Sequence, residues 1–380
     1  MKIWVIGRSY PEPDNNMTGS FEIEQAKMLH KNGEDVSYLC CSLHPKKKIK
    51  EWGFQSWQEE GMAVYSYSAR FFPRIYPFYF LKKRGDVWSR FLQWVFEKEG
   101  MPEVIHVHYP AMLMLADVLL PFQKRGVKIV VTEHWSKVLL KSLDKTELLQ
   151  YRKYFQYIDA CICVGSPLEH AVQEIVGDTK TMMFLVPNVI CPEFQPVYRK
   201  HDGFEFIAVG RLVKVKQFDQ VIQAFSEVFR GKDARLTIIG GGEEQKQLLK
   251  LIDELSMEEQ IILTGRLPRT QVAKRIATAD CLVCYSRFET FGVPIIEAWA
   301  CGVPTMATTT TAVIDNFDER LGVEVHYDNI DELKEKMMYM YENIDRYNKK
   351  FISEFTQERF SEKAVYGKLK DVYQKVRQNM

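Results

Sequence analysis

Short, mainly apolar runs alternate with amphipathic segments along nearly the whole chain, and these runs fall into two series. We predict strands of the first series at residues 2–6, 36–41, 64–67, 104–107, 128–132, 161–164 and 184–186. The second series comprises residues 205–209, 236–239, 261–263, 281–285, 304–307 and 323–325. Strands that are buried on both faces read as continuous apolar runs, so this pattern predicts parallel sheets.

The segments between these runs have the spacing of helices. In the clearest of them, apolar residues recur at helical intervals: Phe218, Val221, Ile222, Phe225, Val228 and Phe229. A charged helix is predicted over residues 357–380, with apolar positions at Phe360, Ala364, Tyr366, Leu369 and Val372. Strands that alternate with helices indicate an α/β fold whose doubly wound sheets carry helices on both faces.

The two series of strands predict two domains. The chain has 380 residues, which is enough for two domains that each bury a core. The series meet in a polar stretch, residues 187–203, which contains Pro192 and Pro196. We therefore expect an N-terminal domain over residues 1–194, joined by the C-terminal helix from about residue 358, and a C-terminal domain over residues 195–357.

The composition is that of a globular protein. Hydrophobic residues make up 46% and charged residues 27%, which excludes a disordered or fibrous chain. Lys and Arg number 51 against 50 Asp and Glu, so no global positive charge indicates a nucleic-acid-binding protein. The first apolar run is too short for a secretory signal and no run is long enough to span a bilayer, so we predict a cytoplasmic protein.

The eight cysteines mostly lie in apolar, strand-like contexts, as expected of buried thiols in a reducing compartment. Cys281 and Cys284 have the spacing of half a zinc site, but no second pair of ligands follows them. We expect no metal site there.

A basic window at residues 44–90 is hidden by the neutral total charge. It holds ten basic residues against four acidic ones, a net charge of +6, interleaved with aromatic residues. The basic residues are Lys46, Lys47, Lys48, Lys50, Arg70, Arg74, Lys82, Lys83, Arg84 and Arg90. This composition suits an anionic membrane surface or a lipid-diphosphate-linked acceptor, and it equally suits a helix whose aromatic side packs on the domain. No recognised module supports binding of single-stranded nucleic acid.

The loop after the strand at 205–209 is also basic. Arg211, Lys214 and Lys216 directly precede the strong helix that starts near Phe218. Cations at a helix N-terminus oppose the helix dipole, so their presence makes sense if a dianion binds between them and the helix N–H groups. The alternative is an ordinary solvated basic loop.

A second loop and helix occupy residues 285–302. Pro294 marks the first helical position and Gly302 lies beyond the end, which would make Val293 the N-cap. Because Val293 has no acceptor in its side chain, the N–H groups of the first turn need another partner, and a phosphate would serve. Glu297 could accept hydrogen bonds from a sugar diol one turn further on, or it could be a surface residue that compensates the helix dipole.

These features occur in a recognisable order. Arg211 and Lys216 are followed by Glu289 and Glu297 in Glu-x7-Glu spacing around Phe-Gly-Val-Pro. Between them come Ile-Gly-Gly-Gly-Glu at 239–243, Leu-Thr-Gly-Arg-Leu at 263–267 and Ala-Asp at 279–280, and Leu-Val-Pro-Asn at 185–188 precedes them. The ordered set resembles the family 4, group 1 nucleotide-sugar glycosyltransferases, most strongly over about residues 185–310.

The resemblance implies the GT-B fold. In this fold, two Rossmann-like domains face a cleft and the C-terminal helix crosses back to the first domain. The N-terminal domain would bind the acceptor and the C-terminal domain the nucleotide-sugar donor.

The resemblance also implies roles for residues of the C-terminal domain. Arg211 and Lys216 would hold the donor diphosphate and stabilise the leaving group, Glu289 would hold the transferred sugar, and Glu297 would bind ribose hydroxyls. The other implied donor-binding residues are Phe291, Gly292 and Val293, through their backbone N–H groups, and Gly265, Arg266 and Leu267, near the base.

In the N-terminal domain, two positions match the family. His134, in Thr-Glu-His-Trp after a central strand, matches a histidine that faces the donor sugar. Gly19 stands where many members have a pair of glycines, and it would open a helix that ends near Gly33. With Arg211, Lys216 and Glu289, His134 completes the implied catalytic set.

The implied reaction is transfer of a sugar from a nucleotide-diphosphate donor with retention at the anomeric carbon. The chain has no Asp-x-Asp motif, so we expect fixed cations and helix N-termini, without a metal cofactor, to stabilise the diphosphate. UDP-hexose is the expected donor, in preference to GDP-mannose. A glycan or lipid-linked glycan of a bacterial surface-polysaccharide pathway is the expected acceptor. The alternatives are a GT-B sugar-nucleotide epimerase and a non-catalytic nucleotide-sugar-binding partner in a polysaccharide assembly complex.

Overall fold

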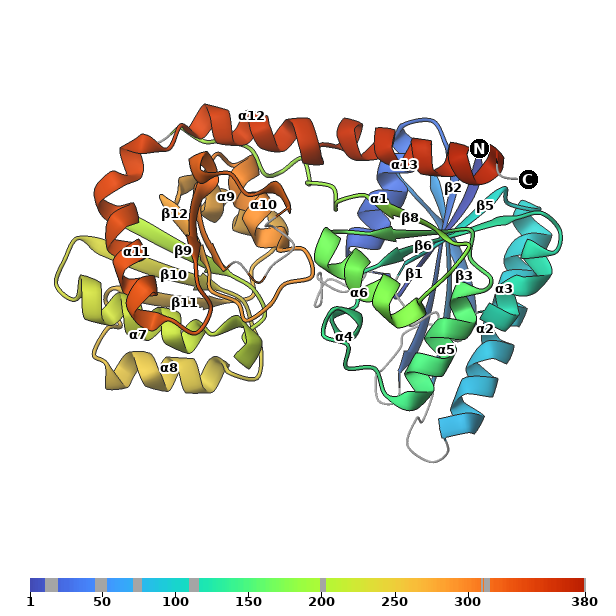
Figure 1. Ribbon diagram of the computed structural model, residues 1–380, viewed down its shortest axis with the longest axis horizontal. Coiled ribbons are helices and arrows are strands. Elements are labelled where there is room, and N and C mark those ends of the chain that lie inside the picture. The colour runs from blue at the N-terminus through green and yellow to red at the C-terminus, as the bar shows by residue number, and fades with distance from the viewer. Residues whose placement is uncertain are drawn as a thin grey trace. The chain divides into compact units, whose positions relative to one another are not determined.

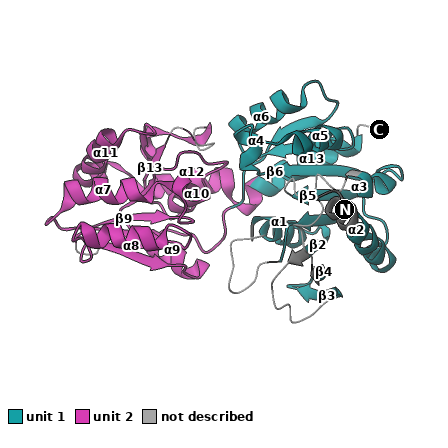
Figure 2. Cartoon of the chain, turned by 90° about the horizontal axis from the view of Figure 1, so that it is seen from below, with its two compact units in different colours: residues 1–189, 365–380 teal, residues 190–364 magenta. Residues whose placement is uncertain are grey.

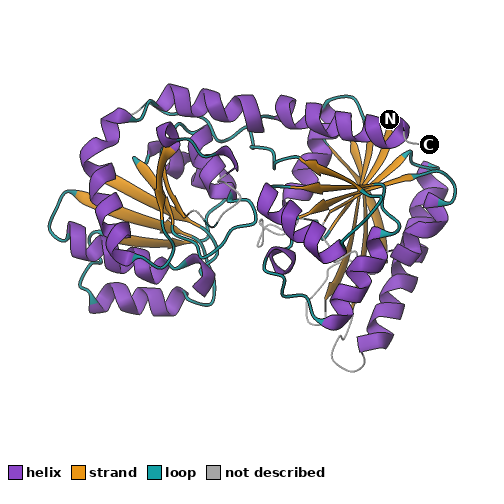
Figure 3. Cartoon of the chain, in the orientation of Figure 1, coloured by secondary structure: helices purple, strands orange, loops and turns teal. Residues whose placement is uncertain are grey.

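The computed structural model describes residues 1–10, 20–44, 53–70, 77–108, 116–198, 203–308, 310 and 315–378, and every structural statement below concerns these residues. The chain divides into two compact units, which Figure 2 colours separately. Unit 1 comprises Met1–Val189 and Val365–Met380, and unit 2 comprises Ile190–Ala364. Each unit is built around one sheet that is flanked by helices (Figure 1, Figure 3).

The units differ by a few residues from the expected domain boundaries. The first division follows Val189 rather than residue 194, and the second follows Ala364 rather than residue 357. The reason for the earlier first division is local, because Ile190 N donates a hydrogen bond of 2.9 Å to the carbonyl oxygen of Phe360, also in unit 2.

Unit 1 contains an eight-stranded sheet with the order β3-β4-β2-β1-β5-β6-β7-β8. Its strands are β1 (Lys2–Gly7), β2 (Asp35–His44), β3 (Gly53–Glu59), β4 (Met62–Arg70), β5 (Val104–His108), β6 (Lys128–Glu133), β7 (Ala160–Cys163) and β8 (Met182–Leu185). Its helices are α1 (Ser20–Lys31), α2 (Pro77–Glu99), α3 (Ala116–Gln123), α4 (Ser136–Leu139), α5 (Lys145–Phe155), α6 (Ser166–Val176) and α13 (Glu362–Gln378). All neighbouring strands are parallel except β3 and β4.

The apolar runs do not predict strand β3. It is the edge strand of the sheet, and its residues alternate between half-buried and exposed. A strand with one face in water lacks the continuous apolar run by which buried strands are recognised. The remaining signal is the turn to β4, where Glu60 and Gly61 both have positive φ, at 50° and 85°, as a two-residue hairpin turn requires.

Unit 2 contains a six-stranded sheet with the order β11-β10-β9-β12-β13-β14, in which all pairs are parallel. Its strands are β9 (Phe204–Val209), β10 (Ala234–Ile239), β11 (Ile261–Gly265), β12 (Cys281–Cys284), β13 (Thr305–Thr308) and β14 (Gly322–Val325). Its helices are α7 (Phe218–Phe229), α8 (Gln245–Glu254), α9 (Arg269–Thr278), α10 (Val293–Ala300), α11 (Ile330–Asn343) and α12 (Lys349–Phe360). The helix predicted from apolar spacing is α7, and five of its six apolar positions are buried in the core of unit 2.

The predicted C-terminal helix is in fact two helices. α12 ends at Phe360 within unit 2, and α13 starts at Glu362. The buried residues of α13 are Val365, Leu369, Val372, Tyr373 and Val376, which belong to the core of unit 1. The return of the final helix to the first domain is therefore confirmed, but the predicted apolar positions Ala364 and Tyr366 flank its buried face and are only partly buried.

The topology of each sheet selects one place for a site. In unit 2 the chain runs from β9 outward to β11 and then returns to the other side of β9 to form β12. Loops that leave two such neighbouring strands diverge, and ligands of doubly wound sheets bind between them at the carboxyl ends. The corresponding neighbours in unit 1 are β1 and β5. Among the described helices, none combines the length and apolarity needed to span a bilayer.

Candidate active site

The loops at the carboxyl edge of the unit 2 sheet are joined by backbone hydrogen bonds. Gly240 N donates to Gly265 O at 3.0 Å, Leu212 N donates to Gly241 O at 3.2 Å, and Arg287 N donates to Val215 O at 2.8 Å. These bonds connect the loops that follow β9, β10, β11 and β12. The basic loop and the Glu289 loop are therefore parts of one assembly.

The glycines of residues 240–242 allow the close approach of these loops. A Cβ atom at Gly240 would lie 1.8 Å from the carbonyl oxygen of Gly210, and one at Gly242 would lie 2.2 Å from that of Leu212. Both neighbours are backbone atoms, so no side-chain rearrangement could make room. The Gly-Gly-Gly sequence is thus required to bring the chain on both sides of Arg211 against the β10 loop.

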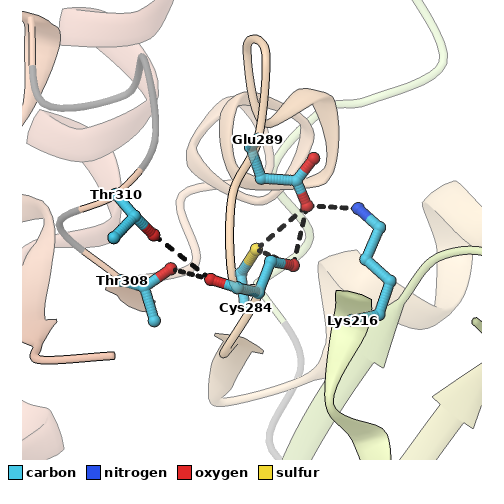
Figure 4. A network of polar contacts seen from close by, with 6 residues as sticks. Lys216, Cys284, Glu289, Thr308 and Thr310 are labelled. Atoms are coloured by element: carbon cyan, nitrogen blue, oxygen red, sulfur yellow. Dashed lines mark hydrogen bonds and ion pairs between the residues drawn. The ribbon is translucent and has the colours of Figure 1, made fainter. Parts of the chain in front are cut away.

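Lys216 and Glu289 form an ion pair at the centre of this assembly (Figure 4). Their side chains are 16% and 12% exposed, so the pair is largely withdrawn from water. Burial is the largest single influence and would lower the pKa of Lys216, but the charge of Glu289, the neighbouring Cys284 and the hydrogen bond to Glu289 together outweigh it, and the pKa is raised. Lys216 therefore remains a cation at neutral pH. The sequence assigned both residues to the site, and the structure brings them together at the β9–β12 neighbours.

The Glu289 carboxylate is held by residues that the sequence analysis missed. Ser286 Oγ donates to Glu289 Oε1 at 2.8 Å, and the carbonyl oxygen of Ser286 accepts hydrogen bonds from Thr308 Oγ1 at 2.6 Å and Thr310 Oγ1 at 3.3 Å (Figure 4). The available signal was the spacing Ser-x-x-Glu directly after a buried strand. The end of β13 therefore helps to fix the Glu289 loop.

Cys284 lies beside the same carboxylate, with Sγ 3.8 Å from Glu289 Oε1. Burial and then the charge of Glu289 raise the pKa of this thiol to about 12, so it is neutral and not a nucleophile at neutral pH. All eight cysteines of the chain are buried free thiols.

Arg211 adds a second positive charge. Its side chain is exposed and, within the described part of the chain, it has no ion-pair partner. Its charge acts on Lys216 and works against the raised pKa of that residue, which shows that the two cations lie within electrostatic range. An exposed guanidinium beside a buried ammonium favours a multivalent anion at this position.

Helix α10 begins one residue earlier than predicted. Its N-cap is Gly292, with φ 83°, and not Val293, because glycine adopts this left-handed conformation without strain. Pro294 is then the second helical residue. No side chain caps the helix, so the main expectation stands: N–H groups at residues 292 and 293 are suited to an anion.

Glu297 is buried rather than a surface residue. Glu297 is 9% exposed, and its Oε1 lies 3.6 Å from Arg269 Nη2. The guanidinium of Arg269 also lies over the ring of Phe194. Burial raises the pKa of Glu297 to about 7, opposed by Arg269 and supported by the charge of Glu193. Glu297 is therefore a strongly perturbed carboxyl group in the helix that starts at the site.

The last predicted residues of unit 2 lie at the end of β11. Gly265 has φ 73°, and the chain leaves the sheet there through an exposed Arg266 and a partly buried Leu267. A Cβ atom at Gly241 would lie 2.9 Å from Arg266 Cγ, so the Arg266 side chain packs on the glycine loop.

His134 of unit 1 lies directly after β6 and belongs to a stack of histidines. His134 Nε2 is 3.4 Å from His108 Nδ1, and the His108 ring stacks on His106 with ring centroids 4.5 Å apart. His106 in turn contacts Tyr373 Oη and Thr132 Oγ1, both at 2.7 Å. Sequence reasoning missed His106 and His108, although His-x-His at a strand end was a usable signal.

The three histidines are neutral at pH 7. Burial lowers the pKa of His106 to about 3, with a smaller effect from His134. Burial and then the charge of Arg8 lower the pKa of His134 to about 3 as well. Burial, followed by the neighbouring His106 and His134 and then Arg8, holds the pKa of His108 well below its usual range. His134 can therefore donate or accept a hydrogen bond but does not carry a charge.

Two predictions fall outside the described residues. Gly19 is one of them. Helix α1, which Gly19 was expected to open, begins at Ser20, and Gly33, with φ 90°, follows the end of this helix as expected. The other is the core of the basic window: residues 45–52 and 71–76 are not described, nor are the side chains of residues 77–84. Both stay predictions.

Two family models together match residues 23–357 of the chain. Residues 192–357 match the model of Glycosyl transferases group 1, and residues 23–194 match that of Glycosyltransferase Family 4. N-acetyl-alpha-D-glucosaminyl L-malate synthase of Bacillus anthracis is 26% identical over 319 residues, which cover 81% of this chain and 79% of that protein.

Two solved structures show the same fold at low sequence identity. Sucrose-phosphate synthase from Thermosynechococcus elongatus matches with a TM-score of 0.81 and 18% identity over 100% of both chains. Anabaena HepE, solved in complex with UDP and glucose, matches with a TM-score of 0.76 and 14% identity over 98% of this chain and 99% of that one.

The buried state of Glu297 predicts a pH-dependent stability. Because its folded pKa of about 7 exceeds the ordinary value of 4.5, the stability it contributes is full below pH 4.5 and is lost as the pH rises through 7. Glu297→Gln should remove this loss, which is on the order of 3 kcal/mol at most. Urea unfolding at pH 5 and pH 8 measures the difference. The control is Glu335→Gln, at an exposed position of α11, which should behave as wild type. If the free energy of unfolding falls equally between pH 5 and pH 8 in Glu297→Gln and in wild type, the prediction is refuted.

Proposed function

The chain belongs to the family 4, group 1 nucleotide-sugar glycosyltransferases and has their GT-B fold, and we propose that it transfers a hexose from a UDP-sugar to a glycan or lipid-linked glycan. We further propose that the transfer retains the configuration of the anomeric carbon and requires no metal ion. The observation that carries the proposal is the Lys216–Glu289 pair at the carboxyl ends of β9 and β12, beside Arg211 and the uncapped start of α10.

The positive groups of unit 2 suit a departing diphosphate. Bond cleavage at the sugar leaves negative charge on the phosphate, and preorganised donors in a partly dry site stabilise such charge strongly. Arg211, Lys216 and the N–H groups of Gly292 and Val293 offer two cations and a helix N-terminus for this purpose. The proposal of metal-independent transfer rests on this set of groups.

The ion pair suggests how Lys216 and Glu289 divide their roles. In the structure Lys216 and Glu289 form an ion pair with each other. A bound diphosphate would offer Lys216 an alternative anion, and the Glu289 carboxylate would then be available to the hydroxyl groups of the transferred sugar. Ser286, which donates to the same carboxylate oxygen, would keep Glu289 in position during this exchange.

We propose a front-face path for the chemical step. The bond between the anomeric carbon and the phosphate oxygen breaks to give an ion-pair-like state, and the acceptor oxygen forms its bond on the same face. The acceptor proton passes to the leaving phosphate oxygen, so no enzyme nucleophile is needed. His134, neutral and at the end of β6, is proposed to contact the sugar, as its match to the family histidine implies.

The remaining donor contacts follow the family resemblance. Glu297 is proposed to bind the ribose, a role for which a half-protonated carboxyl group near pH 7 can both donate and accept. Residues 265–267 are proposed to lie near the base, and Gly19 near the donor. The HepE structure, which was solved in complex with UDP and glucose, supports a UDP-sugar as the donor. The Bacillus anthracis relative is named as an N-acetylglucosaminyl enzyme, which makes UDP-N-acetylglucosamine the second donor to test.

The setting is proposed to be bacterial and cytoplasmic, at the inner face of the membrane, in surface-polysaccharide or lipid-linked glycan synthesis. The basic window at residues 44–90 would provide the membrane contact. No metal cofactor and no nucleic-acid partner is proposed.

Donor binding should stabilise the folded protein. We expect UDP-glucose or UDP-N-acetylglucosamine, and not GDP-mannose, to raise the thermal unfolding temperature, with about 2.7 kcal/mol of stabilisation at 100 times the Kd. Lys216→Ala should abolish the shift, whereas Lys350→Ala, an exposed lysine of α12, should preserve it. No shift with any nucleotide sugar would contradict the proposed function.

Turnover should depend on the ion pair and not on a metal. Lys216→Ala and Glu289→Ala should each lower the rate of UDP release from UDP-glucose by about 100- to 1000-fold, because each removes a group that stabilises the transition state. EDTA should leave the wild-type rate unchanged. Near-normal rates in both variants would refute the assignment. An isomerised sugar nucleotide from donor alone would indicate the epimerase instead.

Binding to an anionic surface tests the basic window. Co-sedimentation with phosphatidylglycerol-containing liposomes at low salt should capture the protein, and the binding should weaken as salt screens the charges. Neutral phosphatidylcholine liposomes are the control. Absence of binding to the anionic liposomes at low salt would remove the membrane proposal.

A further inference from the structure

We propose that Glu133 is a positioning residue that holds the loop carrying His134, through its carboxylate, in the conformation needed for transfer. The inference rests on the proposed function, because it assumes that His134 acts on the donor. Glu133 precedes His134 in the sequence, but nothing in the sequence analysis gave it a role. It is the last residue of β6 and only 1% of it is exposed.

One oxygen of the carboxylate binds this loop and the other binds helix α5. Its Oε1 accepts hydrogen bonds from the backbone N–H groups of His134, at 2.8 Å, and Trp135, at 2.7 Å. Its Oε2 accepts a hydrogen bond of 2.7 Å from the hydroxyl of Tyr151, a residue of α5 that is 1% exposed. Three donors from two segments thus converge on one buried group.

The loop needs such an acceptor because of where it lies. β6 pairs with β7 up to the register Glu133–Cys163, and α4 begins at Ser136. The N–H groups of His134 and Trp135 therefore lie between the end of a strand and the first turn of a helix. Trp135 is the N-cap of α4 and its side chain accepts no hydrogen bond from the helix. A side chain at the N-cap would accept from the second or third helical N–H group and not from these two, so Glu133 supplies their acceptor from the strand side.

Burying a carboxylate to accept these N–H groups is unfavourable in free energy. Burial raises the pKa of Glu133 to about 7, and the hydrogen bonds from Tyr151, Trp135 and His134 only partly offset that effect. A neutral acceptor at this position would avoid the free-energy cost of burying a charge. The cost is understandable if the exact course of residues 134 and 135 matters for the reaction.

The His134 ring is constrained on its other side by His108. The two rings stack with centroids 5.7 Å apart, and His108 itself rests on His106. His106 is fixed by Tyr373 of α13 and by Thr132 of β6. The ring thus has a rigid neighbour, while the backbone that carries it is held by Glu133. Release of the backbone would move the ring relative to that neighbour without changing any residue of unit 2.

Amide hydrogen exchange tests the clamp without a substrate. In Glu133→Ala, exchange in the segment 134–139 should accelerate by about tenfold or more, while segments of unit 2 keep their wild-type rates. Glu133→Gln should stay close to wild type, because one amide oxygen can accept both N–H groups and its NH₂ can donate to Tyr151. Tyr151→Phe, which leaves Glu133 Oε1 in place to accept both N–H groups, should have a smaller effect than Glu133→Ala. Unchanged exchange in Glu133→Ala would overturn the proposal.

A double-mutant cycle tests whether the clamp acts through His134. With UDP-glucose as donor, Glu133→Ala should lower kcat for UDP release by about 10- to 100-fold, with unchanged affinity for UDP. Glu133→Ala combined with His134→Ala should be no slower than His134→Ala alone, because the positioned ring is already absent. Multiplicative losses in the double variant would show a general structural role and overturn the inference.

The two proposals fail in different ways. Wild-type protein that releases no UDP from UDP-glucose, or His134→Ala with the wild-type rate, would contradict the proposed function or the role of His134 in it. The catalytic part of the inference would fall with that role. The exchange experiment would still decide whether Glu133 holds the loop.

Discussion

The central strands of both sheets are buried on both faces, and this constraint decides where chemistry can occur. Every residue of β12 is buried, and the first polar side chains of the site, Ser286 and Glu289, come directly after its end. The same holds in unit 1, where β6 is buried up to Glu133 and His134 follows. Polar groups excluded from the strands collect at the carboxyl edges, and close backbone packing must then bring their loops together. The glycines at 240–242 serve this requirement.

The same constraint explains which parts of the fold could be predicted. Continuous apolar runs identify the buried parallel strands, and strong amphipathic spacing identifies α7. The edge strand β3 could not be predicted from apolar runs, because one of its faces is in water. The break between helices at Ser361 could not be predicted either, because both flanking helices have similar composition. The start of α10 was misplaced by one residue, since Pro294 is compatible with either of the first two helical positions and the φ of Gly292 decides between them.

For the site, the sequence could supply residues with a family precedent but not those whose role depends on contacts. Lys216 and Glu289 are 73 residues apart, and only the strand order makes them neighbours. Ser286 and the histidine stack have only short spacings, Ser-x-x-Glu and His-x-His after a strand, and Thr308 has no distinctive spacing. They are recognised only through contacts that lead to predicted site residues. Ser286 donates to Glu289, Thr308 donates to the carbonyl oxygen of Ser286, and the histidine stack includes His134. Glu133 is the extreme case, since its contacts are with backbone N–H groups, which no side-chain pattern reveals.

Three buried carboxylates show how the partner determines the role. The partners of Glu289 are a lysine and a hydroxyl group, and the partner of Glu297 is an arginine at 3.6 Å. Glu133 accepts hydrogen bonds from two backbone N–H groups and a tyrosine hydroxyl. The pKa values of Glu297 and Glu133 are raised to about 7, because an imperfect ion pair and neutral donors do not fully replace water. Glu289 is the carboxylate whose partner is itself a candidate for donor binding. A diphosphate that attracts Lys216 would leave Glu289 partly buried without its counter-charge, and sugar hydroxyls would compensate it. If the proposed donor site is right, the ion pair would couple binding of the phosphate to binding of the sugar, and this coupling would give an intact nucleotide sugar an advantage over a free nucleotide.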